Sequence, residues 1–263
     1  MFLCKQTEHA EHVIKNGFSS KYIAYELRLI ALYYRDKGVL PKERKEKIYE
    51  ICQKHIEGFN RVHYYKEINR VITYSSNKRN KLIDIDSVPI TLAELDYIGN
   101  LDIDYLCRKI LFGYIVQVKL NKAKWMIKKD EDPNNEYFLY DTLLGKLMGY
   151  LGIDRSEFRK YGYQKTTDVN YYLNDNGIIE DLIGKIKLLY MYDIPEDNSI
   201  AFEVKVFEAM GLYYDLYCGI KNVKECKECS VPIKVKSNRT KYCGECSKDV
   251  KNKQNKKYYH LGK

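Results

Sequence analysis

Four cysteines near the end of the chain have the side-chain type and the spacing needed to bind a metal ion. Cys226 and Cys229 form one Cys-x-x-Cys pair, and Cys243 and Cys246 form a second pair after thirteen intervening residues. Two such pairs with a loop of this length are typical of a zinc ribbon. Four thiolates close a tetrahedron around Zn²⁺ and leave no open position, so we expect one structural zinc ion. The alternatives are two disulfides or four unrelated free cysteines.

Two other groups of cysteine and histidine residues have spacings that metal sites also use. One is the pair Cys52 and His55, and the other joins Cys4 with His9 and His12. Residues three apart on a helix often share only a buried face. The sequence therefore leaves open a second metal site, at either group or shared between the two.

The elements that would position the four cysteines can be predicted from their surroundings. The stretch 231–236 (Val-Pro-Ile-Lys-Val-Lys) predicts a strand between the two pairs, and the tyrosine-rich stretch 207–219 predicts a helix that seats the metal module. Residues 247–259 predict a basic helix. This helix has too few apolar residues to be stable alone, so we expect it to become ordered on a partner.

The positive charge of the chain is concentrated at the same end. The formal net charge is +9, and residues 221–263 contain 13 Lys and Arg against 4 Asp and Glu. The first 220 residues contain 32 basic and 32 acidic residues, so their balance is zero. A concentrated basic tail favours a polyanionic partner, and the alternative is a solvated terminus without a partner.

We predict that basic side chains of the ribbon and tail neutralise the phosphates of a nucleic acid, with DNA favoured over RNA. Arg239 could also make a bidentate contact with a phosphate or a guanine, and Tyr242 could stack on a base or pack in the ribbon core. The predicted contacts of this part are Lys234, Lys236, Arg239, Lys241, Lys248, Lys251, Lys253, Lys256 and Lys257.

Residues 1–86 predict a domain made of helices. Apolar residues recur at helical spacing in the stretches 7–16, 19–37, 41–58 and 61–74. Ser19 or Ser20 could cap the second helix, and Pro41 suits the first turn of the third. The polar stretch 75–86 predicts a loop at a domain boundary. We find no catalytic constellation in this part.

Residues 87–219 predict a winged-helix-like domain. Thr91 and Glu94 form a capping-box pattern before a short helix, and residues 103–122 predict an apolar core helix. Residues 125–136 predict a loop, and residues 137–151 predict a helix. A later helix ends before Gly177, and two alternating strands follow at 185–192 and 200–206. This order of elements is that of a winged helix.

In a winged helix, the helix before Gly177 would be the recognition helix that enters a groove of DNA. Its hydroxyl, amide and basic side chains are of the types that contact phosphates and base edges. Acidic residues leave the region roughly neutral, so contact with nucleic acid by this domain stays open. The predicted contacts are Lys160, Gln164, Lys165, Thr167 and Asn170, and Arg159 and Thr166 are also able to face a groove.

Several segments carry a resemblance to a known family. They are residues 90–95 (Ile-Thr-Leu-Ala-Glu-Leu), 106–115, 173–179 (Leu-Asn-Asp-Asn-Gly-Ile-Ile) and 226–246, and the specific feature is the cysteine ribbon with its Asn-Arg-Thr-Lys-Tyr-Cys segment. These segments resemble uncharacterised phage and prophage proteins of low-GC Gram-positive bacteria, over the last two thirds of the chain. The resemblance implies a phage-encoded accessory protein that associates with DNA or RNA, and it implies no reaction.

Taken together, the sequence predicts a mainly α fold with small β parts. The parts are an N-terminal helical domain (1–86), the winged-helix-like domain (87–219), a zinc ribbon (220–247) and a basic tail (248–263). Paired winged helices commonly bind as dimers, so a homodimer is a further expectation. No catalytic motif is present, and we therefore expect no enzymatic activity.

The second hypothesis for the function is a factor that binds and modulates or inhibits a host protein. Adjacent tyrosines on a helix place one ring away from the core, where it suits an interface. The pairs are Tyr33 and Tyr34, Tyr64 and Tyr65, Tyr171 and Tyr172, and Tyr213 and Tyr214. The start of the chain lacks the pattern of a secretory leader and no stretch is apolar enough to span a membrane, so we expect a cytoplasmic location in a bacterial host.

Overall fold

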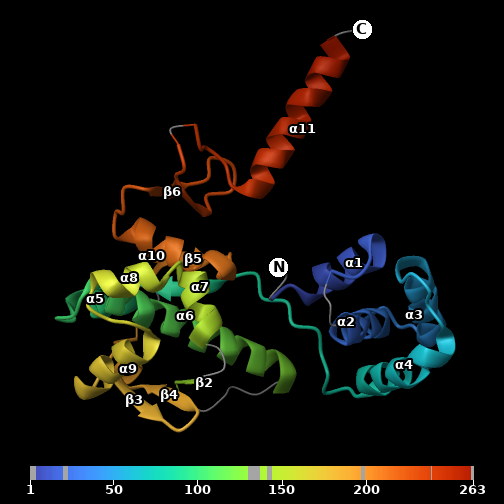
Figure 1. The fold of residues 1–263 in the computed structure, drawn as a ribbon, viewed down its shortest axis with the longest axis horizontal. Helices are drawn as coiled ribbons and strands as arrows, with labels where there is room; N and C mark the ends of the chain where they lie inside the picture. The colour runs from blue at the N-terminus through green and yellow to red at the C-terminus, as the bar shows by residue number, and fades with distance from the viewer. Residues whose placement is uncertain are drawn as a thin grey trace. The chain divides into compact units, whose positions relative to one another are not determined.

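The computed structural model describes residues 4–19, 23–129, 137–140, 144–196, 199–237 and 239–261, with the backbone alone for 254–261. The prediction of a mainly helical fold with small sheets is confirmed (Figure 1). The helices are α1 (Gln6–Asn16), α2 (Ile23–Asp36), α3 (Pro41–His55), α4 (Arg61–Ser76), α5 (Leu92–Asn100), α6 (Tyr105–Lys129), α7 (Leu144–Leu151), α8 (Arg155–Lys160), α9 (Thr166–Asp175), α10 (Gly211–Tyr217) and α11 (Gly244–Leu261), with short 3-10 helices η2 (Leu189–Tyr192) and η3 (Phe207–Ala209). The strands are β1 (Val88–Thr91), β2 (Phe138–Tyr140), β3 (Ile179–Leu182), β4 (Lys185–Leu188), β5 (Ile200–Val204), β6 (Val223–Glu225) and β7 (Pro232–Lys234).

The chain divides into two compact units. The first unit comprises Met1–Asp86 and Leu120–Asn134, and the second comprises Ser87–Lys119 and Asn135–Lys263. Helices α1 to α4 therefore belong to the first unit. The sheets and the four cysteines of the ribbon belong to the second unit.

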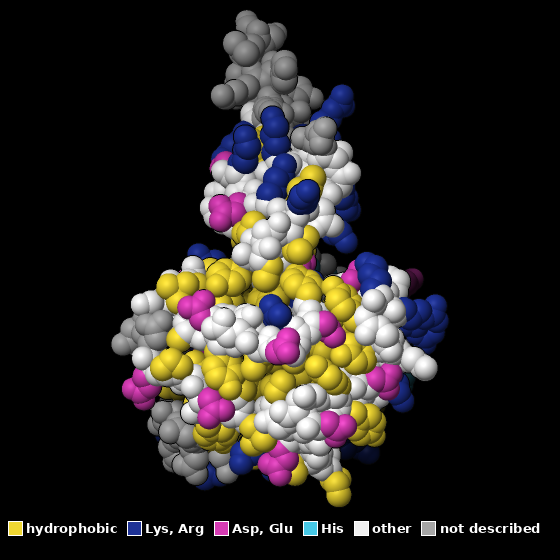
Figure 2. Space-filling view, turned by 90° about the vertical axis from the view of Figure 1, so that its left-hand side faces the viewer, with side chains coloured by type: hydrophobic (Ala, Val, Ile, Leu, Met, Phe, Trp, Pro, Cys, Tyr) yellow, Lys and Arg dark blue, Asp and Glu magenta, His cyan; other side chains and the backbone are white. Residues whose placement is uncertain are grey.

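The first 220 residues have no net charge because two segments carry opposite net charges that cancel. Residues 1–86 contain 17 basic and 11 acidic residues, a net charge of +6. Residues 87–220 contain 15 basic and 21 acidic residues, a net charge of −6. Figure 2 shows a face of the second unit on which apolar and acidic side chains are mixed, whereas Lys and Arg gather over the ribbon and the start of α11.

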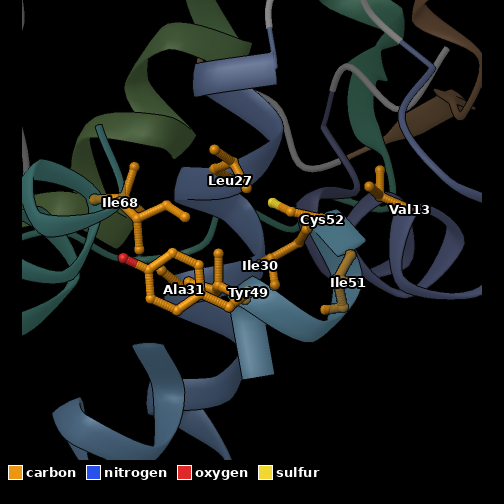
Figure 3. Packing of buried hydrophobic residues seen from close by; sticks show 10 residues of the cluster. Val13, Leu27, Ile30, Ala31, Tyr49, Ile51, Cys52 and Ile68 are labelled. Carbon is orange, nitrogen blue, oxygen red and sulfur yellow. The ribbon is translucent and has the colours of Figure 1, made fainter. Parts of the chain in front are cut away.

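The first unit folds because each of its four helices has apolar residues at helical spacing. Val13 of α1, Leu27 and Ile30 of α2, and Ile48 of α3 are fully buried in one core, which Ile68 of α4 completes (Figure 3). The predicted helical stretches are confirmed. Local signals set their ends: Pro41 starts α3, and the Asn60 side chain accepts a hydrogen bond from the backbone N–H of Val62 at 2.8 Å.

The second unit is built around α6, whose side chains from 109 to 118 are all buried. The prediction of an apolar core helix is therefore confirmed. The predicted capping box of α5 is also confirmed, because the Glu94 carboxylate accepts from the backbone N–H of Thr91 at 2.8 Å and the Thr91 hydroxyl accepts from that of Glu94 at 3.2 Å. These local signals position α5 directly after strand β1.

Two predictions for residues 125–151 are wrong. Helix α6 continues to Lys129 through a stretch that we predicted as a loop. Residues 124–129 contain neither Gly nor Pro, so no helix-breaking residue ends the helix earlier. Residues 137–151 do not form one helix: Phe138–Tyr140 is strand β2, where aromatic residues favour a strand, and α7 begins only at Leu144.

The two strands predicted at 185–192 and 200–206 do not pair with each other. Strand β4 ends at Leu188 and lies between β2 and β3 in a three-stranded antiparallel sheet of order β2-β4-β3. A two-residue turn joins β3 to β4, and its Gly184 has φ +76°, a conformation that glycine adopts without strain. Strand β5 instead pairs with β1 in a separate sheet. The short local turn favours the β3–β4 hairpin over the longer connection that we predicted.

Candidate metal centre

The two Cys-x-x-Cys pairs come together in space, as the spacing predicts. One sulfur atom from each of Cys226, Cys229, Cys243 and Cys246 lies within 4.8 Å of the others. The Sγ atoms of Cys229 and Cys243 are 3.8 Å apart, and all four residues are free thiols, not disulfides. Within the described ranges, no other group of three or more potential ligands is this close. The four cysteines could therefore hold one metal ion.

A tight turn presents the first pair. Strands β6 and β7 pair antiparallel, with Val223 opposite Lys234, and the turn between them contains Cys226 and Cys229. The Cys226 backbone donates to the Val231 carbonyl at 2.9 Å, and the Ser230 N–H donates back to the Cys226 carbonyl at 3.0 Å. Strand β7 confirms the predicted strand, shortened to three residues. The hairpin therefore holds the first pair on a fixed backbone.

The second pair is part of the start of helix α11. Cys243 directly precedes the helix, and its sulfur accepts a hydrogen bond from the backbone N–H of Cys246 at 3.4 Å. A side chain that accepts from the third helical residue is an N-cap, so this cysteine caps the helix with sulfur in place of oxygen. The Lys227 N–H donates to the Lys241 carbonyl at 3.1 Å and ties the two pairs together.

The sulfur atoms differ in their electrostatic surroundings. Burial alone would raise the pKa of the Cys226 thiol, but the backbone N–H groups of Cys229, Cys243 and Glu228 point to its sulfur and lower the pKa to about 6. Burial raises the pKa of Cys229, and the neighbouring thiols of Cys243 and Cys229 raise that of Cys246. Four sulfurs this close repel one another as thiolates, and a bound cation would relieve that repulsion.

Helix α10 supports the ribbon, which confirms the predicted packing helix. It packs against β6 and β7 and, on another side, against α7. Both Tyr213 and Tyr214 are buried, so the expectation that one ring of each tyrosine pair faces away from the core is wrong for this pair. The reason is that α10 is covered on more than one side: the Tyr213 hydroxyl accepts from the backbone of Lys205 at 3.0 Å, and the Tyr214 ring stacks on Phe112.

The predicted basic contacts of the ribbon and of α11 are on the surface. Their described members are all exposed, namely Lys234, Lys236, Arg239, Lys241, Lys248, Lys251 and Lys253. Lys253 lies 3.7 Å from the carboxylate of Glu228 in an exposed ion pair, which contributes little to stability. Tyr242 is half-buried. The side chains of Lys256 and Lys257, and all of Asn238, lie outside the described residues.

The predicted contacts around α9 are only partly exposed. Gln164, Lys165 and Thr167 are exposed at the start of the helix, and the Asp168 carboxylate accepts from the backbone N–H of Gln164 at 2.8 Å. Lys160 is exposed but lies 2.5 Å from a carboxylate oxygen of Glu157.

Asn170 is a wrong prediction. The side chain is 3% exposed, and its oxygen accepts a hydrogen bond from the Tyr114 hydroxyl at 2.7 Å. It shares the buried face of α9 with Val169 and Leu173, so it cannot face a groove.

The other cysteine and histidine groups do not assemble into a second cluster among the described residues. The His9 ring lies 2.9 Å from the buried carboxylate of Glu26, which also accepts from the backbone N–H and the hydroxyl of Ser19. Cys52 is buried in the helical core, where burial raises the pKa of its thiol to about 12. The His55 ring is 3.3 Å from the carbonyl oxygen of Ile14. Packing and hydrogen bonding therefore account for His9, Cys52 and His55.

Sequence reasoning missed a buried ion pair in the second unit. The Lys109 ammonium lies 2.6 Å from the Asp215 carboxylate, which also accepts from the Tyr105 hydroxyl at 2.6 Å. Burial raises the pKa of Tyr105, and the hydrogen bond to Asp215 adds to the effect. The three residues border a cavity of about 510 Å³. The partners are far apart in sequence, so no local pattern could have indicated them.

Comparisons with protein-family models, with curated proteins and with solved structures found no match to this chain. Among the described residues, every helix is too short or too polar to cross a membrane. Function must therefore be inferred from geometry and charge.

Proposed function

We propose that the four cysteines hold one structural Zn²⁺ ion and that the ribbon with α11 binds nucleic acid, with DNA favoured over RNA. A tetrahedral site with zinc–sulfur bonds of about 2.3 Å has sulfur atoms about 3.8 Å apart. The distance between the sulfur atoms of Cys229 and Cys243 is 3.8 Å, and all four sulfurs fit within 4.8 Å. This set of thiolates suits zinc, which favours four sulfur ligands in structural sites.

The observation that carries the proposal is the position of Cys243 at the start of α11. The same sulfur that would bind the metal also caps a helix rich in lysine. Metal binding would therefore stabilise the first turn of this helix and fix Lys248, Lys251 and Lys253 relative to the ribbon. An ordered array of exposed cations gives a strong, salt-sensitive attraction to phosphates.

A winged-helix role for the region from β2 to β4 is a further part of the proposal. It is supported by the element order α7-α8-α9-β3-β4 and by the sheet order β2-β4-β3, with α9 before the hairpin. In this arrangement Gln164, Lys165 and Thr167 would be nearest a groove. The net charge of −6 in residues 87–220 opposes strong phosphate binding, so we assign the main affinity to the ribbon and α11.

The resemblance to phage proteins supports an accessory role in the cytoplasm of a bacterial host, and we assign no catalytic activity to the chain. Such a protein would act by binding to nucleic acid and not by catalysing a reaction on it. We propose no homodimer contact.

A second candidate function is the binding of a host protein by the acidic part of the second unit that precedes the ribbon. It is favoured by exposed apolar side chains on neighbouring segments: Leu92 is 43% exposed and Ile200 is 56% exposed. The two lie close together, because the backbone N–H of Leu92 donates to the carbonyl of Ser199 at 2.9 Å. Neighbouring exposed apolar side chains of this kind occur at protein interfaces.

Fluorescence anisotropy with labelled duplex DNA, single-stranded DNA and RNA across a salt series tests the proposal. The intact zinc-loaded chain is compared with Cys246→Ser and with the triple variant Lys248→Ala, Lys251→Ala and Lys253→Ala. The matched control removes three exposed lysines elsewhere, at Lys15, Lys42 and Lys54. The α11 variant should reduce the salt slope for duplex DNA by about 2.7, at about 0.9 per phosphate contact.

The outcomes separate the two candidates. Loss of affinity in the α11 variant and in Cys246→Ser, with little change in the control, supports the ribbon as the binding site. If the wild-type chain binds none of the three nucleic acids at low salt, the proposal is wrong. Capture of a host protein through the exposed apolar side chains of Leu92 and Ile200 then becomes the test of the second candidate.

A further inference from the structure

The positive charge of the first unit is concentrated in one helix and the loop that follows it. Residues 61–81 contain six basic residues and one acidic residue, Glu67. This difference of five accounts for most of the net charge of +6 carried by residues 1–86. The basic residues are Arg61, Lys66, Arg70, Lys78, Arg79 and Lys81. The ribbon and α11 do not involve this segment, so its charge needs a separate explanation.

The outer side of α4 combines these charges with exposed aromatic rings. A shallow groove of about 560 Å³ runs along the helix and is lined by Tyr65, Lys66, Asn69, Arg70, Thr73 and Tyr74. No acidic residue lines it. Tyr65 is 54% exposed and Tyr74 is 38% exposed, whereas Ile68 and Val71 on the opposite side of the helix are buried in the core. The aromatic rings are therefore not needed to fill the core.

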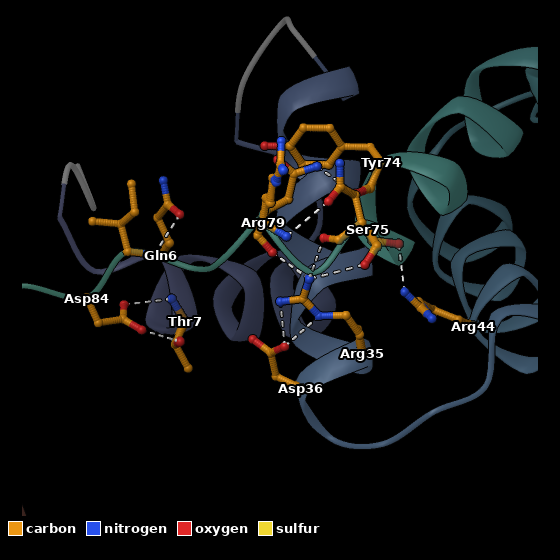
Figure 4. Close-up of polar contacts among 12 residues, drawn as sticks. Gln6, Thr7, Arg35, Asp36, Arg44, Tyr74, Ser75, Arg79 and Asp84 are labelled. Carbon is orange, nitrogen blue, oxygen red and sulfur yellow. Dashed lines mark hydrogen bonds and ion pairs between the residues drawn. The ribbon is translucent and has the colours of Figure 1, made fainter. Parts of the chain in front are cut away.

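Hydrogen bonds from the Arg35 side chain hold the backbone of the basic loop that follows α4. The Arg35 guanidinium donates to the carbonyl oxygens of Ser75 and Asn77, both at 3.2 Å, and to that of Asn80 (Figure 4). Asp36 holds the guanidinium at 2.7 Å. The exposed side chains of Lys78 and Arg79 thus extend from a fixed backbone, unlike those of a solvated tail. A fixed set of charges loses less conformational entropy when it binds a ligand.

Cations also lie beside the exposed rings. The Lys45 ammonium is 4.6 Å from the centre of the Tyr65 ring, and the Arg28 guanidinium is 5.4 Å from that of Tyr74. These contacts orient the rings. Aromatic side chains interleaved with basic ones are the combination that binds single-stranded nucleic acid, because unpaired bases can stack while the phosphates meet cations.

We propose that the outer side of α4 and the loop 77–81, here called the α4 face, bind single-stranded nucleic acid. Tyr65 and Tyr74 stack on unpaired bases, and Lys66, Arg70 and Arg79 neutralise phosphates. The inference rests on the proposed function in one respect, namely that the chain acts on nucleic acid. It is carried by other residues, in the other unit, and can fail while the role of the ribbon stands.

The test uses the full-length, zinc-loaded chain and labelled single-stranded and duplex DNA in a salt series. The first variant, Lys66→Ala with Arg70→Ala, removes two exposed charges from the α4 face. Its matched control, Lys42→Ala with Lys54→Ala, removes two exposed charges from α3. The first variant should reduce the salt slope for single-stranded DNA by about 1.4, at about 0.7 for each lost phosphate contact. If variant and wild type have the same affinity at about 1 M salt, the variant then binds roughly 25-fold more weakly than the wild type at about 0.1 M salt. The control should match the wild type.

A second pair of variants tests the stacking. Tyr65→Ala should weaken the binding of single-stranded DNA about tenfold and leave duplex binding unchanged, because paired bases are not available to the ring. Tyr65→Phe keeps the ring and should restore the affinity. Tyr192→Ala, at a tyrosine that is 48% exposed in the second unit and lies outside both proposed binding surfaces, is the control. All six positions changed in these variants and controls are exposed, and melting by circular dichroism should confirm unchanged folding.

The possible results distinguish the two proposals. If the wild type binds and the α11 variant weakens binding, but the α4-face variants behave as their controls do, the α4 face is not a binding surface and this inference is overturned. Equal losses for single-stranded and duplex DNA in Tyr65→Ala would also overturn it. If the wild type binds no nucleic acid, both the proposed function and this inference are overturned. An acidic protein then becomes the candidate partner of the α4 face.

Discussion

Helices α7 and α10 come so close that Gly211 has no room for a side chain. A Cβ atom at this position would lie 2.2 Å from the carbonyl oxygen of Leu151 and 2.6 Å from its carbonyl carbon. Both atoms belong to the backbone, so no side-chain rotation relieves the overlap. The two helices would have to separate by about 1 Å to restore an ordinary contact. Because α10 also supports β6 and β7, the same movement would disturb the base of the ribbon.

We predict that Gly211→Ala lowers the free energy of unfolding by about 3 kcal/mol, the upper end of the cost of overpacking. Urea denaturation followed by the helical circular-dichroism signal, in excess Zn²⁺, measures it. With a typical urea dependence, the midpoint should fall by roughly 1–1.5 M.

Two other glycines provide matched controls. At Gly113 an added Cβ would meet the side chain of Leu151, with its Cδ1 atom at 2.7 Å, and a flexible side chain can move. We expect a smaller loss for Gly113→Ala, about 1 kcal/mol, because alanine also favours the helix. At Gly149 nothing lies within 4 Å, so Gly149→Ala should stabilise the protein by up to about 1 kcal/mol. A midpoint for Gly211→Ala equal to that of the wild type would refute the reasoning.

Three further predictions concern the metal and the buried polar groups. Cys246→Ser removes one of four ligands and should reduce bound zinc, measured by atomic absorption, from close to one ion per chain in the wild type; undiminished zinc would contradict the site. Glu26→Gln weakens the hydrogen bonds to Ser19 and His9 and should cost about 2–3 kcal/mol in thermal unfolding, whereas Glu157→Gln, at a half-buried surface position, should cost less than about 1 kcal/mol. Burial raises the pKa of the Cys52 and Cys107 thiols to about 12, so in the zinc-loaded chain, whose ribbon thiolates the metal would protect, a thiol reagent at pH 8 followed by mass spectrometry should label the exposed Cys218 first and reach those two only on unfolding. Since the unfolded thiols ionise near 9.0, their contribution to stability should decline as the pH rises above that value.

Short-range signals in the sequence predicted the parts of the structure that depend on short-range interactions. The helices of the first unit follow from apolar spacing with caps such as Asn60, and the capping box of Thr91 and Glu94 is satisfied within one turn. The metal cluster was predictable for the same reason, because each Cys-x-x-Cys pair lies on one turn and only thirteen residues separate the two pairs.

Long-range partners account for the errors. We predicted residues 138–140 as part of a helix. They form strand β2 because β4, which lies some fifty residues later in the chain, pairs with them, with Phe138 opposite Lys187. The exposure of Asn170 was predicted from its side-chain type, whereas its burial depends on the Tyr114 hydroxyl of α6. Tertiary contacts of this kind override local propensity, and a single sequence does not reveal them.

The pairing of β1 with β5 determines when the second unit can fold during synthesis. Val88 lies opposite Val204, so the intervening chain must leave the ribosome before this sheet closes. Closing so long a loop is entropically costly and slow. Until then β1 has unpaired edges that can join other nascent chains, whereas the helical core cluster of the first unit is built from residues 13–72 and can begin to form early. The growing chain should therefore depend most on chaperones between the completion of α4 and the emergence of β5.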